Sequence, residues 1–371
     1  MGGEFSINKK VILIFHKPLF QIDGQIKYVK SLIKSLSLQY EVEIPSEEFF
    51  KSRKEINSWV VRTLLVNSYL IFWVLKNRDK LKNTHFICIM EDRYTIFPTY
   101  LAVKLTHIKL VSRISDWGDN YISSMPNNNL LYYLMGLLNK IYEKFVITYS
   151  GSIIVPSDFV YKQISKIYKK NICYYLLPYE FSPPPNSGII NDIVFTDNEH
   201  DIYCILVGNY NYKPNEESAD FLINQLAGQV NKVDQNIKFL LVGSGSLEKY
   251  SPYNSSNILA LGLVPDLSQV YAKCSIGINP SLTRGGTSIK NIEYLVNGMY
   301  VVTTPQASIG VIESTNMFVY DRKDFSRVIC ELAKKIREGK IIHDEKEIEK
   351  IRERYSESKI SNDLLKFLES D

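Results

Sequence analysis

Short apolar runs rich in β-branched residues recur along the chain, and patterns of helical periodicity separate them. In the first half these runs occupy residues 10–15, 85–90, 109–114, 151–156 and 172–178. In the second half they occupy residues 201–208, 237–243, 257–262, 275–280, 299–304 and 317–320. Strands that are apolar throughout are typical of parallel sheets covered by helices on both faces. The pattern therefore predicts an α/β protein with doubly wound sheets.

The length of the chain, 371 residues, favours two domains over one. Residues 178–201 contain three consecutive prolines and little periodicity, which indicates a linker. We therefore predict an N-terminal, acceptor-side domain at 1–186, a second, nucleotide-sugar-binding domain at 187–355 and a C-terminal helix at 356–371 that packs back on the first domain; the ligands assigned to the two domains rest on the motifs described below. Two such domains are expected to face each other across a cleft lined by the carboxyl ends of their strands.

Composition narrows the class of protein. The net charge of +4 is spread without runs of like charge, so the sequence predicts no binding of nucleic acid. Five cysteines are scattered without C-x-x-C pairs, which indicates reduced thiols in a cytoplasmic protein and no metal site. The first ten residues lack the apolar core of a signal peptide. The longest apolar stretch, 59–75, is interrupted by Arg62 and several polar residues and is a poor membrane span.

The most unusual local motif is "RGGTSIKNIE", residues 284–293. Its two glycines permit close backbone approach, and Thr287 or Ser288 can begin the helix that follows. Lys290 falls in the first turn, where the helix dipole favours an anion, so a bound phosphate would explain it. Glu293 lies one turn further on the same face and could accept hydrogen bonds from a ribose diol. The motif therefore predicts a site for a nucleoside diphosphate, or else a tight turn with solvated side chains.

Several motifs in the second half occur in the order and spacing of a known family. They are "LVGNYNYKPNEE", "LVGSGS", "LGLVPDLSQVYA" and "NPSLTRGGTSIKNIEYLVNGMYVVTT". Residues 202–310 thereby resemble the C-terminal domain of group-1, family-4-like glycosyltransferases, which have the GT-B fold. The resemblance implies transfer of a sugar from a nucleotide sugar, with UDP or GDP as the expected carrier and no other cofactor. It favours retention of the anomeric configuration and, with no Asp-x-Asp motif in the chain, a metal-independent reaction.

The resemblance also assigns roles to individual residues. The diphosphate would be surrounded by Arg284, Gly285, Gly286, Thr287, Ser288 and Lys290, and Glu293 would bind the ribose. The other residues expected at the donor are Gly24 and Gly208, on loops facing the phosphates, and Leu263 and Val264, near the base. Many relatives carry a second glutamate eight positions before the ribose-binding one, and here that position is Gly285, so the sugar itself is not predicted.

A catalytic base is expected just after a strand of the first half, because transfer requires the acceptor hydroxyl to lose its proton. The candidates are Asp116 and Glu91, weighed against ordinary capping or solvated carboxylates. The family often has His-Asp where this chain reads Ser115-Asp116. His16, after the first strand, and Asp92, beside Glu91, are further candidates.

Two helical segments, residues 57–83 and 128–151, are rich in Leu, Tyr and Trp with basic residues at their edges. They are interpreted either as core helices or as a surface that touches the inner face of the cell membrane to reach a lipid-linked acceptor. The expected enzyme is a hexosyltransferase that acts on a glycan or lipid-linked acceptor in bacterial surface polysaccharide or glycolipid synthesis.

Two alternatives stay open. One is a nucleotide-sugar epimerase on the same fold, which would need more acid–base residues in the second half. The other is a non-catalytic sugar-nucleotide-binding protein with a degenerate first domain. A hydride-transferring enzyme is disfavoured, because no G-x-G-x-x-G follows the first strand.

Overall fold

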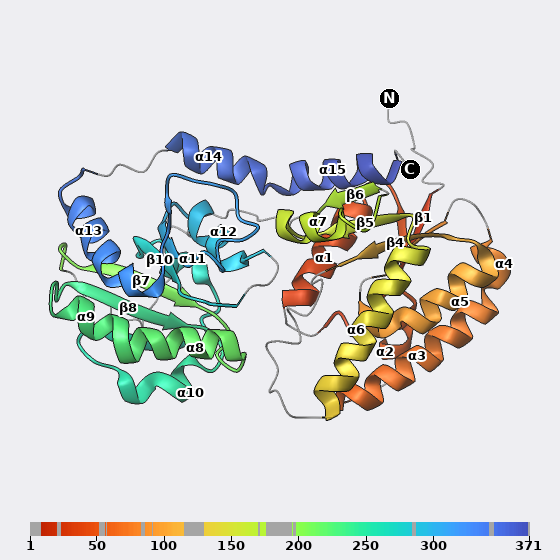
Figure 1. Ribbon diagram of the computed structural model, residues 1–371, viewed down its shortest axis with the longest axis horizontal. Coiled ribbons are helices and arrows are strands. Elements are labelled where there is room, and N and C mark those ends of the chain that lie inside the picture. The colour runs from red at the N-terminus through yellow and green to blue at the C-terminus, as the bar shows by residue number, and fades with distance from the viewer. Residues whose placement is uncertain are drawn as a thin grey trace. The chain divides into compact units, whose positions relative to one another are not determined.

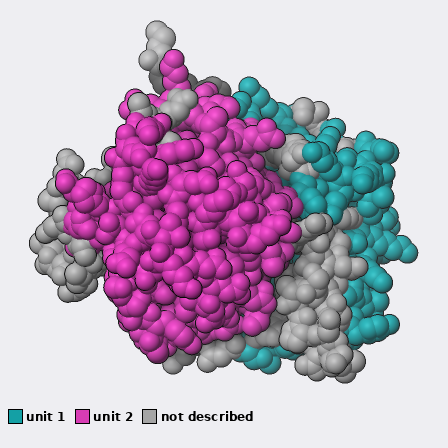
Figure 2. Space-filling view, turned by 60° about the vertical axis from the view of Figure 1, so that its left-hand side comes forward, with its two compact units in different colours: residues 1–178, 357–371 teal, residues 179–356 magenta. Residues whose placement is uncertain are grey.

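The computed structural model forms two compact units (Figure 2): unit 1 comprises residues 1–178 and 357–371, and unit 2 comprises residues 179–356. The residues that the structure describes are 9–20, 24–51, 56, 58–82, 86–90, 92–114, 130–169, 171–175, 195, 198–283, 287–340 and 345–369. Each unit is built around one parallel sheet.

The sheet of unit 1 has the strand order β2-β1-β3-β4-β5-β6 in the described part of the chain, and its strands pair in parallel. The strands are β1 (Lys10–Ile14), β2 (Glu41–Glu43), β3 (Phe86–Met90), β4 (Lys109–Arg113), β5 (Ser152–Val155) and β6 (Asn171–Tyr174). All except β2 coincide with apolar runs in the sequence. The edge strand β2 reads Glu-Val-Glu, and a single apolar residue leaves no pattern to predict it from.

Helices cover both faces of this sheet (Figure 1). They are α1 (Gly24–Leu36), α2 (Pro45–Lys51), α3 (Trp59–Lys76), α4 (Arg78–Leu81), η1 (Arg93–Thr95), α5 (Ile96–Thr106), α6 (Leu130–Tyr149), α7 (Asp158–Ile164) and α15 (Glu357–Glu369). One face packs its strand residues against α2, α3, α5 and α6 in a single apolar cluster. On α3 the buried residues Val66, Leu70, Trp73 and Val74 follow helical spacing, which explains why this segment is amphipathic.

Unit 2 repeats the architecture with the order β12-β11-β10-β7-β8-β9, again in parallel. Its strands are β7 (Ile202–Val207), β8 (Ile237–Val242), β9 (Ile258–Gly262), β10 (Ile276–Asn279), β11 (Tyr300–Thr303) and β12 (Met317–Val319). All six coincide with the predicted runs. The predicted α/β class with two doubly wound sheets is thus confirmed.

The helical elements of unit 2 are α8 (Lys213–Phe221), η4 (Leu222–Leu226), α9 (Ala227–Asn231), α10 (Ser246–Tyr250), η5 (Ser251–Tyr253), α11 (Leu267–Tyr271), α12 (Ile289–Val296), η6 (Arg322–Asp324), α13 (Phe325–Arg337) and α14 (Glu345–Arg354). Alternation along β10 separates the two faces of the sheet. Ile276 and Ile278 join the apolar cluster formed with α8, α9 and α13, whereas Gly277 faces Tyr294 of α12. A Cβ at residue 277 would lie 2.2 Å from the Tyr294 ring, so glycine allows α12 to sit directly on the strand.

The C-terminal helical segment divides into two helices. α14 packs on α12 in unit 2, whereas α15 packs on α1 and β6 of unit 1. Ser35 and Ser361 share a buried hydrogen bond of 2.7 Å, and Lys34 pairs with Glu357 at 2.6 Å. Residues 357–371 are therefore part of unit 1 although they come last in the chain.

Candidate donor site

The sheet of unit 2 reverses direction next to β7. From β7 the chain builds β8 and β9 on one side and then crosses to β10, β11 and β12 on the other. In doubly wound sheets ligands bind beyond the carboxyl ends of the strands at this reversal. The fold therefore directs attention to the residues that follow β7 and β10.

Glycines bring the loops after β7 and β8 very close together. Gly208 donates a backbone hydrogen bond to the Val242 carbonyl, 3.0 Å away, and Gly243 donates one of 2.7 Å to the Gly262 carbonyl. Gly243 has φ +125°, and a Cβ there would lie 2.1 Å from the Gly208 carbonyl oxygen. Only glycine fits at residue 243, and the backbone beside the predicted phosphate-facing residue Gly208 is thereby held in place.

Helix α12 begins beyond β10, as the motif predicted. Ser288 is its N-cap residue, but its side chain makes no capping hydrogen bond to the helix. Its hydroxyl instead accepts from Asn279 Nδ2 at 2.8 Å, and Asn279 also donates to Asn291 at 2.9 Å. These bonds attach the start of the helix to the end of the strand. The N–H groups of the first turn are left without a cap from Ser288, as an anion site requires.

Lys290 connects the two elements that flank the reversal. Its Nζ donates to Asn215 Oδ1 of α8 at 2.8 Å, and Asn215 in turn donates to the Asn209 carbonyl at 3.0 Å. Burial lowers the pKa of the Lys290 ammonium to about 8, and the nearby Glu293 carboxylate opposes this shift. A cation held in a half-buried place near a helix N-terminus is suited to an anionic ligand.

Glu293 lies on the same face of α12, one turn after Lys290. Its Oε2 accepts a hydrogen bond of 3.1 Å from the hydroxyl of Tyr271, at the end of α11. Tyr271 is itself buried and packs edge-on against Tyr294, with ring centroids 6.1 Å apart. The carboxylate is thus oriented by a rigid neighbour, and its second oxygen belongs to a half-buried side chain.

The other predicted donor residues differ in how far the structure describes them. Leu263, directly after β9, is 77% exposed, which is unusual for leucine and suits contact with a ligand; Val264 beside it is half-buried. Thr287 is half-buried next to the N-cap, and Gly24 begins α1 in unit 1. Several predicted residues lie outside the described part of the chain: Arg284, Gly285, Gly286, Asp116 and Glu91.

Unit 1 holds a pair of residues that the sequence analysis considered separately. His16 follows β1 and Asp92 follows β3, and these strands are neighbours in the sheet. His16 Nδ1 lies 2.7 Å from Asp92 Oδ2, and both residues are buried. The signal in the sequence was only that each polar residue follows an apolar strand.

The family of unit 2 follows from its sequence. Residues 201–335, which include the loops of the site, α12 and both Lys290 and Glu293, match the family model for glycosyl transferases, group 1. Unit 2 carries a group-1 glycosyltransferase domain. A search of curated protein sequences gives no match for the chain.

The chain as a whole resembles solved glycosyltransferase structures. Sucrose-phosphate synthase from Thermosynechococcus elongatus aligns over 98% of both chains, with a TM-score of 0.71 and 11% identity. HepE from Anabaena, solved with UDP-glucose, aligns over 98% of this chain and 100% of its own, with a TM-score of 0.65 and 12% identity. TarM is 16% identical with a TM-score of 0.58 over 81% of this chain, which spans 58% of the TarM chain. The protein therefore has the GT-B fold around its group-1 domain.

Two searches for other kinds of site complete the description. Within the described ranges, no group of three or more His, Cys, Asp or Glu side chains is placed to hold a metal ion. Among the helices described, none is both long enough and apolar enough to cross a bilayer.

Proposed function

We propose that the protein transfers a sugar from a nucleoside diphosphate sugar to a hydroxyl group of an acceptor. The observation that carries this proposal is the placement of Lys290 and Glu293 on one face of α12, at the reversal of a sheet whose sequence belongs to a group-1 glycosyltransferase domain. A cation and a free helix N-terminus suit the diphosphate, and a carboxylate one turn away suits the ribose diol.

The remaining donor contacts follow from the same arrangement. We assign the exposed edge of Leu263 and Val264 to the base, and Gly208 with residues 284–288 to the diphosphate. Gly24 of unit 1 is assigned to the phosphates as well. UDP is the preferred carrier and GDP the second, and the UDP-glucose bound by HepE supports this order.

The leaving diphosphate gains negative charge in the transition state, and Lys290 with the α12 N-terminus can offset it. We therefore propose a metal-independent reaction, in which EDTA leaves the rate unchanged. Asp116 and Glu91 are retained as the proposed catalytic carboxylates. The family resemblance predicts that the anomeric configuration is retained, and the configuration of the product tests this.

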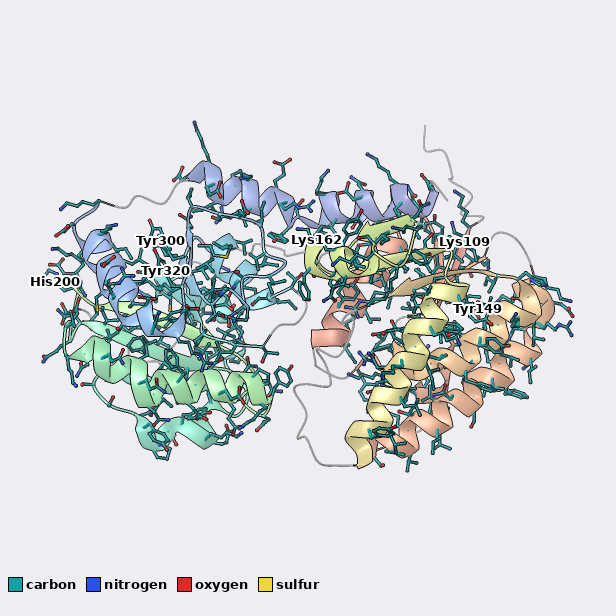
Figure 3. All side chains as sticks on the ribbon, in the orientation of Figure 1. Lys109, Tyr149, Lys162, His200, Tyr300 and Tyr320 are labelled. Atoms are coloured by element: carbon teal, nitrogen blue, oxygen red, sulfur yellow. The ribbon has the colours of Figure 1, made fainter. Side chains whose placement is uncertain are left out.

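The acceptor is proposed to be a glycan or lipid-linked molecule of bacterial surface polysaccharide or glycolipid synthesis. Support comes from the surface of unit 1, where α3 and α6 expose large apolar side chains, among them Leu64, Phe72, Leu134 and Leu137. An apolar groove of about 540 Å³ also runs between α5 and α6. Tyr149, labelled in Figure 3, lines its end on α6, and Lys104 lies 5.2 Å from the centre of the Tyr149 ring.

These surfaces suit a protein that acts at the inner face of the cell membrane. We expect binding to vesicles containing anionic phospholipid at low salt, and a loss of that binding in Leu64→Glu with Phe72→Glu. Val233→Glu is the matched control, because Val233 is 74% exposed but lies in unit 2. Wild-type protein that ignores such vesicles would exclude the membrane contact.

The donor site is tested by titrating UDP-, GDP-, ADP- and CMP-sugars into the protein by calorimetry. Glu293→Ala and Lys290→Ala should each weaken the best ligand by about 10- to 100-fold, the magnitude expected for charge-assisted hydrogen bonds. Lys273→Ala and Glu248→Ala, on exposed residues of the same unit, should bind as wild type does.

Product analysis separates the alternative functions. A glycosyltransferase releases the nucleoside diphosphate only as the acceptor gains a sugar, whereas an epimerase changes the sugar without an acceptor. A protein that binds the nucleotide sugar but catalyses neither change would be a non-catalytic binding protein. If no nucleotide or nucleotide sugar binds, the donor site proposed here is wrong.

A further inference from the structure

The buried pair in unit 1 is built with unusual completeness for two polar side chains. Asp92 Oδ2 accepts from His16 Nδ1 at 2.7 Å and from the His16 backbone N–H at 3.2 Å. Asp92 Oδ1 accepts from the Tyr94 backbone N–H at 2.8 Å, which starts the helical turn η1. The carboxylate is thus held from both oxygens although its side chain is only 5% exposed.

The imidazole ring is held as firmly. Its centroid lies 4.8 Å from that of Tyr94 and 5.7 Å from that of Phe15. With Nδ1–H donated to Asp92, the lone pair of the neutral ring is on Nε2. Nε2 is not among the buried polar atoms that lack a partner, and in the described part of the chain no hydrogen bond uses it. That nitrogen therefore keeps contact with solvent, while the rest of the ring is enclosed.

The position of the pair in the sheet also points to a ligand. In the described sheet of unit 1, β1 lies between β2 and β3, and the chain runs first to β2 on one side and then to β3 on the other. The carboxyl ends of β1 and β3 are therefore the reversal point of unit 1, as β7 and β10 are in unit 2. A histidine with a fixed tautomer at this edge is placed where a bound molecule would meet Nε2.

We infer that His16 and Asp92 form the general base that activates the acceptor hydroxyl. His16 is the catalytic residue, since Nε2 touches the reacting hydroxyl, and Asp92 is a positioning residue that acts through the ring. This inference rests on the proposed transferase function and adds to it the group that removes the proton.

The step is balanced as follows in atoms and charge. The acceptor oxygen forms a bond to the anomeric carbon of the donor sugar while its proton passes to Nε2. The bond from the anomeric carbon to the diphosphate oxygen breaks, and its electron pair leaves with the nucleoside diphosphate. The imidazolium is stabilised by the Asp92 carboxylate until the proton is released to water.

A base on the protein has a stereochemical consequence. When it drives a single displacement, the acceptor attacks opposite the leaving diphosphate, so the anomeric configuration inverts. The family resemblance predicts retention instead. The two predictions exclude each other, and the configuration of the product, measured by proton NMR, decides between them.

The test uses variants that separate the base from its structural hydrogen bond. In His16→Asn the amide can still donate to Asp92, but no basic nitrogen remains. We expect kcat to fall by about 10²- to 10⁴-fold, the usual contribution of a general base, with the KM values and nucleotide affinity unchanged. Asp92→Asn should lower kcat by a smaller factor, again without changing KM. His107→Asn is the control, because His107 is exposed in unit 1 and has φ 55°, which asparagine tolerates.

The outcomes separate this inference from the function beneath it. Nucleotide binding that responds to Glu293→Ala, together with transfer by the wild type, establishes the function. A folded His16→Asn protein that then transfers at the wild-type rate, or a product with retained configuration, would overturn the role of His16. If Asp116→Asn or Glu91→Gln abolishes transfer while His16→Asn does not, the base is one of those carboxylates. Thermal melting of each variant shows whether a lost rate reflects lost folding.

Discussion

The reversal points of the two sheets carry different kinds of chemistry. In unit 2 the strand ends are followed by glycines, a helix N-terminus, and the half-buried Lys290 and Glu293. In unit 1 they are followed by a histidine and an aspartate that are almost completely buried against each other. A large anion needs close approach of backbone and an accessible cation, whereas proton transfer needs one group in a fixed orientation. The same architecture therefore serves binding at one edge and supports acid–base chemistry at the other.

The largest expected effect comes from removing the glycine contact on which the unit 2 edge depends. Gly243→Ala would place a Cβ 2.1 Å from the Gly208 carbonyl oxygen at φ +125°. We expect the free energy of unfolding to fall by about 3 kcal/mol or more and nucleotide binding to be lost, as measured by urea denaturation and calorimetry.

The matched control for that substitution is Gly228→Ala in α9. A Cβ at Gly228 would meet nothing within 4 Å. Alanine is favoured over glycine in helices, so the free energy of unfolding should rise by about 0.5–1 kcal/mol. If both variants behave alike, close backbone approach does not hold the unit 2 edge together.

A smaller effect should appear in the pH dependence of donor binding. Burial gives Lys290 a pKa of about 8 in the free protein, and a bound diphosphate would raise it. The bound state thus holds a proton that the free state loses above pH 8. Affinity for the nucleotide should be flat below about pH 8 and fall by up to about tenfold per pH unit above it.

The substitution Lys290→Arg tests the origin of that dependence. Arginine stays charged throughout this range, so the fall above pH 8 should disappear. A fall of unchanged size would assign the titration to a group other than Lys290. Calorimetry between pH 6 and 9.5 measures both proteins.

The smallest expected effect concerns the orientation of Glu293. Tyr271→Phe removes the hydroxyl that donates to Glu293 at 3.1 Å but retains the ring that packs on Tyr294. Nucleotide affinity should fall by about two- to tenfold, as for loss of a hydrogen bond of about 0.5–1.5 kcal/mol. Tyr253→Phe, at a half-exposed tyrosine of the same unit, is the control. Unchanged affinity in Tyr271→Phe would mean that packing alone orients the carboxylate.

Most of the fold could be predicted from the sequence because buried parallel strands are apolar throughout. Eleven predicted runs became strands, and the short polar edge strand β2 was missed for lack of any pattern. The donor site was also largely predictable, since Lys290 and Glu293 lie on one helix and the spacing of the residues already places them on one face. The roles of Lys290 and Glu293 remain proposals until ligand binding is measured.

The contacts around these residues were not predictable. Asn215 reaches Lys290 from 75 positions away in the chain, and Tyr271 reaches Glu293 across 22. Nothing local in the sequence distinguishes these side chains from other polar residues of unit 2. Only the packing of α8 and α11 beside α12 brings them to the site.

The sequence by itself determined the strand pattern, the start of α12 and the spacing of its charged face, because each depends on neighbouring residues and on backbone periodicity. The tertiary structure alone decided that His16 and Asp92, 76 positions apart, meet within hydrogen-bonding distance. Their meeting depends on β1 and β3 being adjacent in the sheet, and sheet order is set by long-range packing. The binding face was therefore visible in a short stretch of sequence, and the buried pair only in the folded chain.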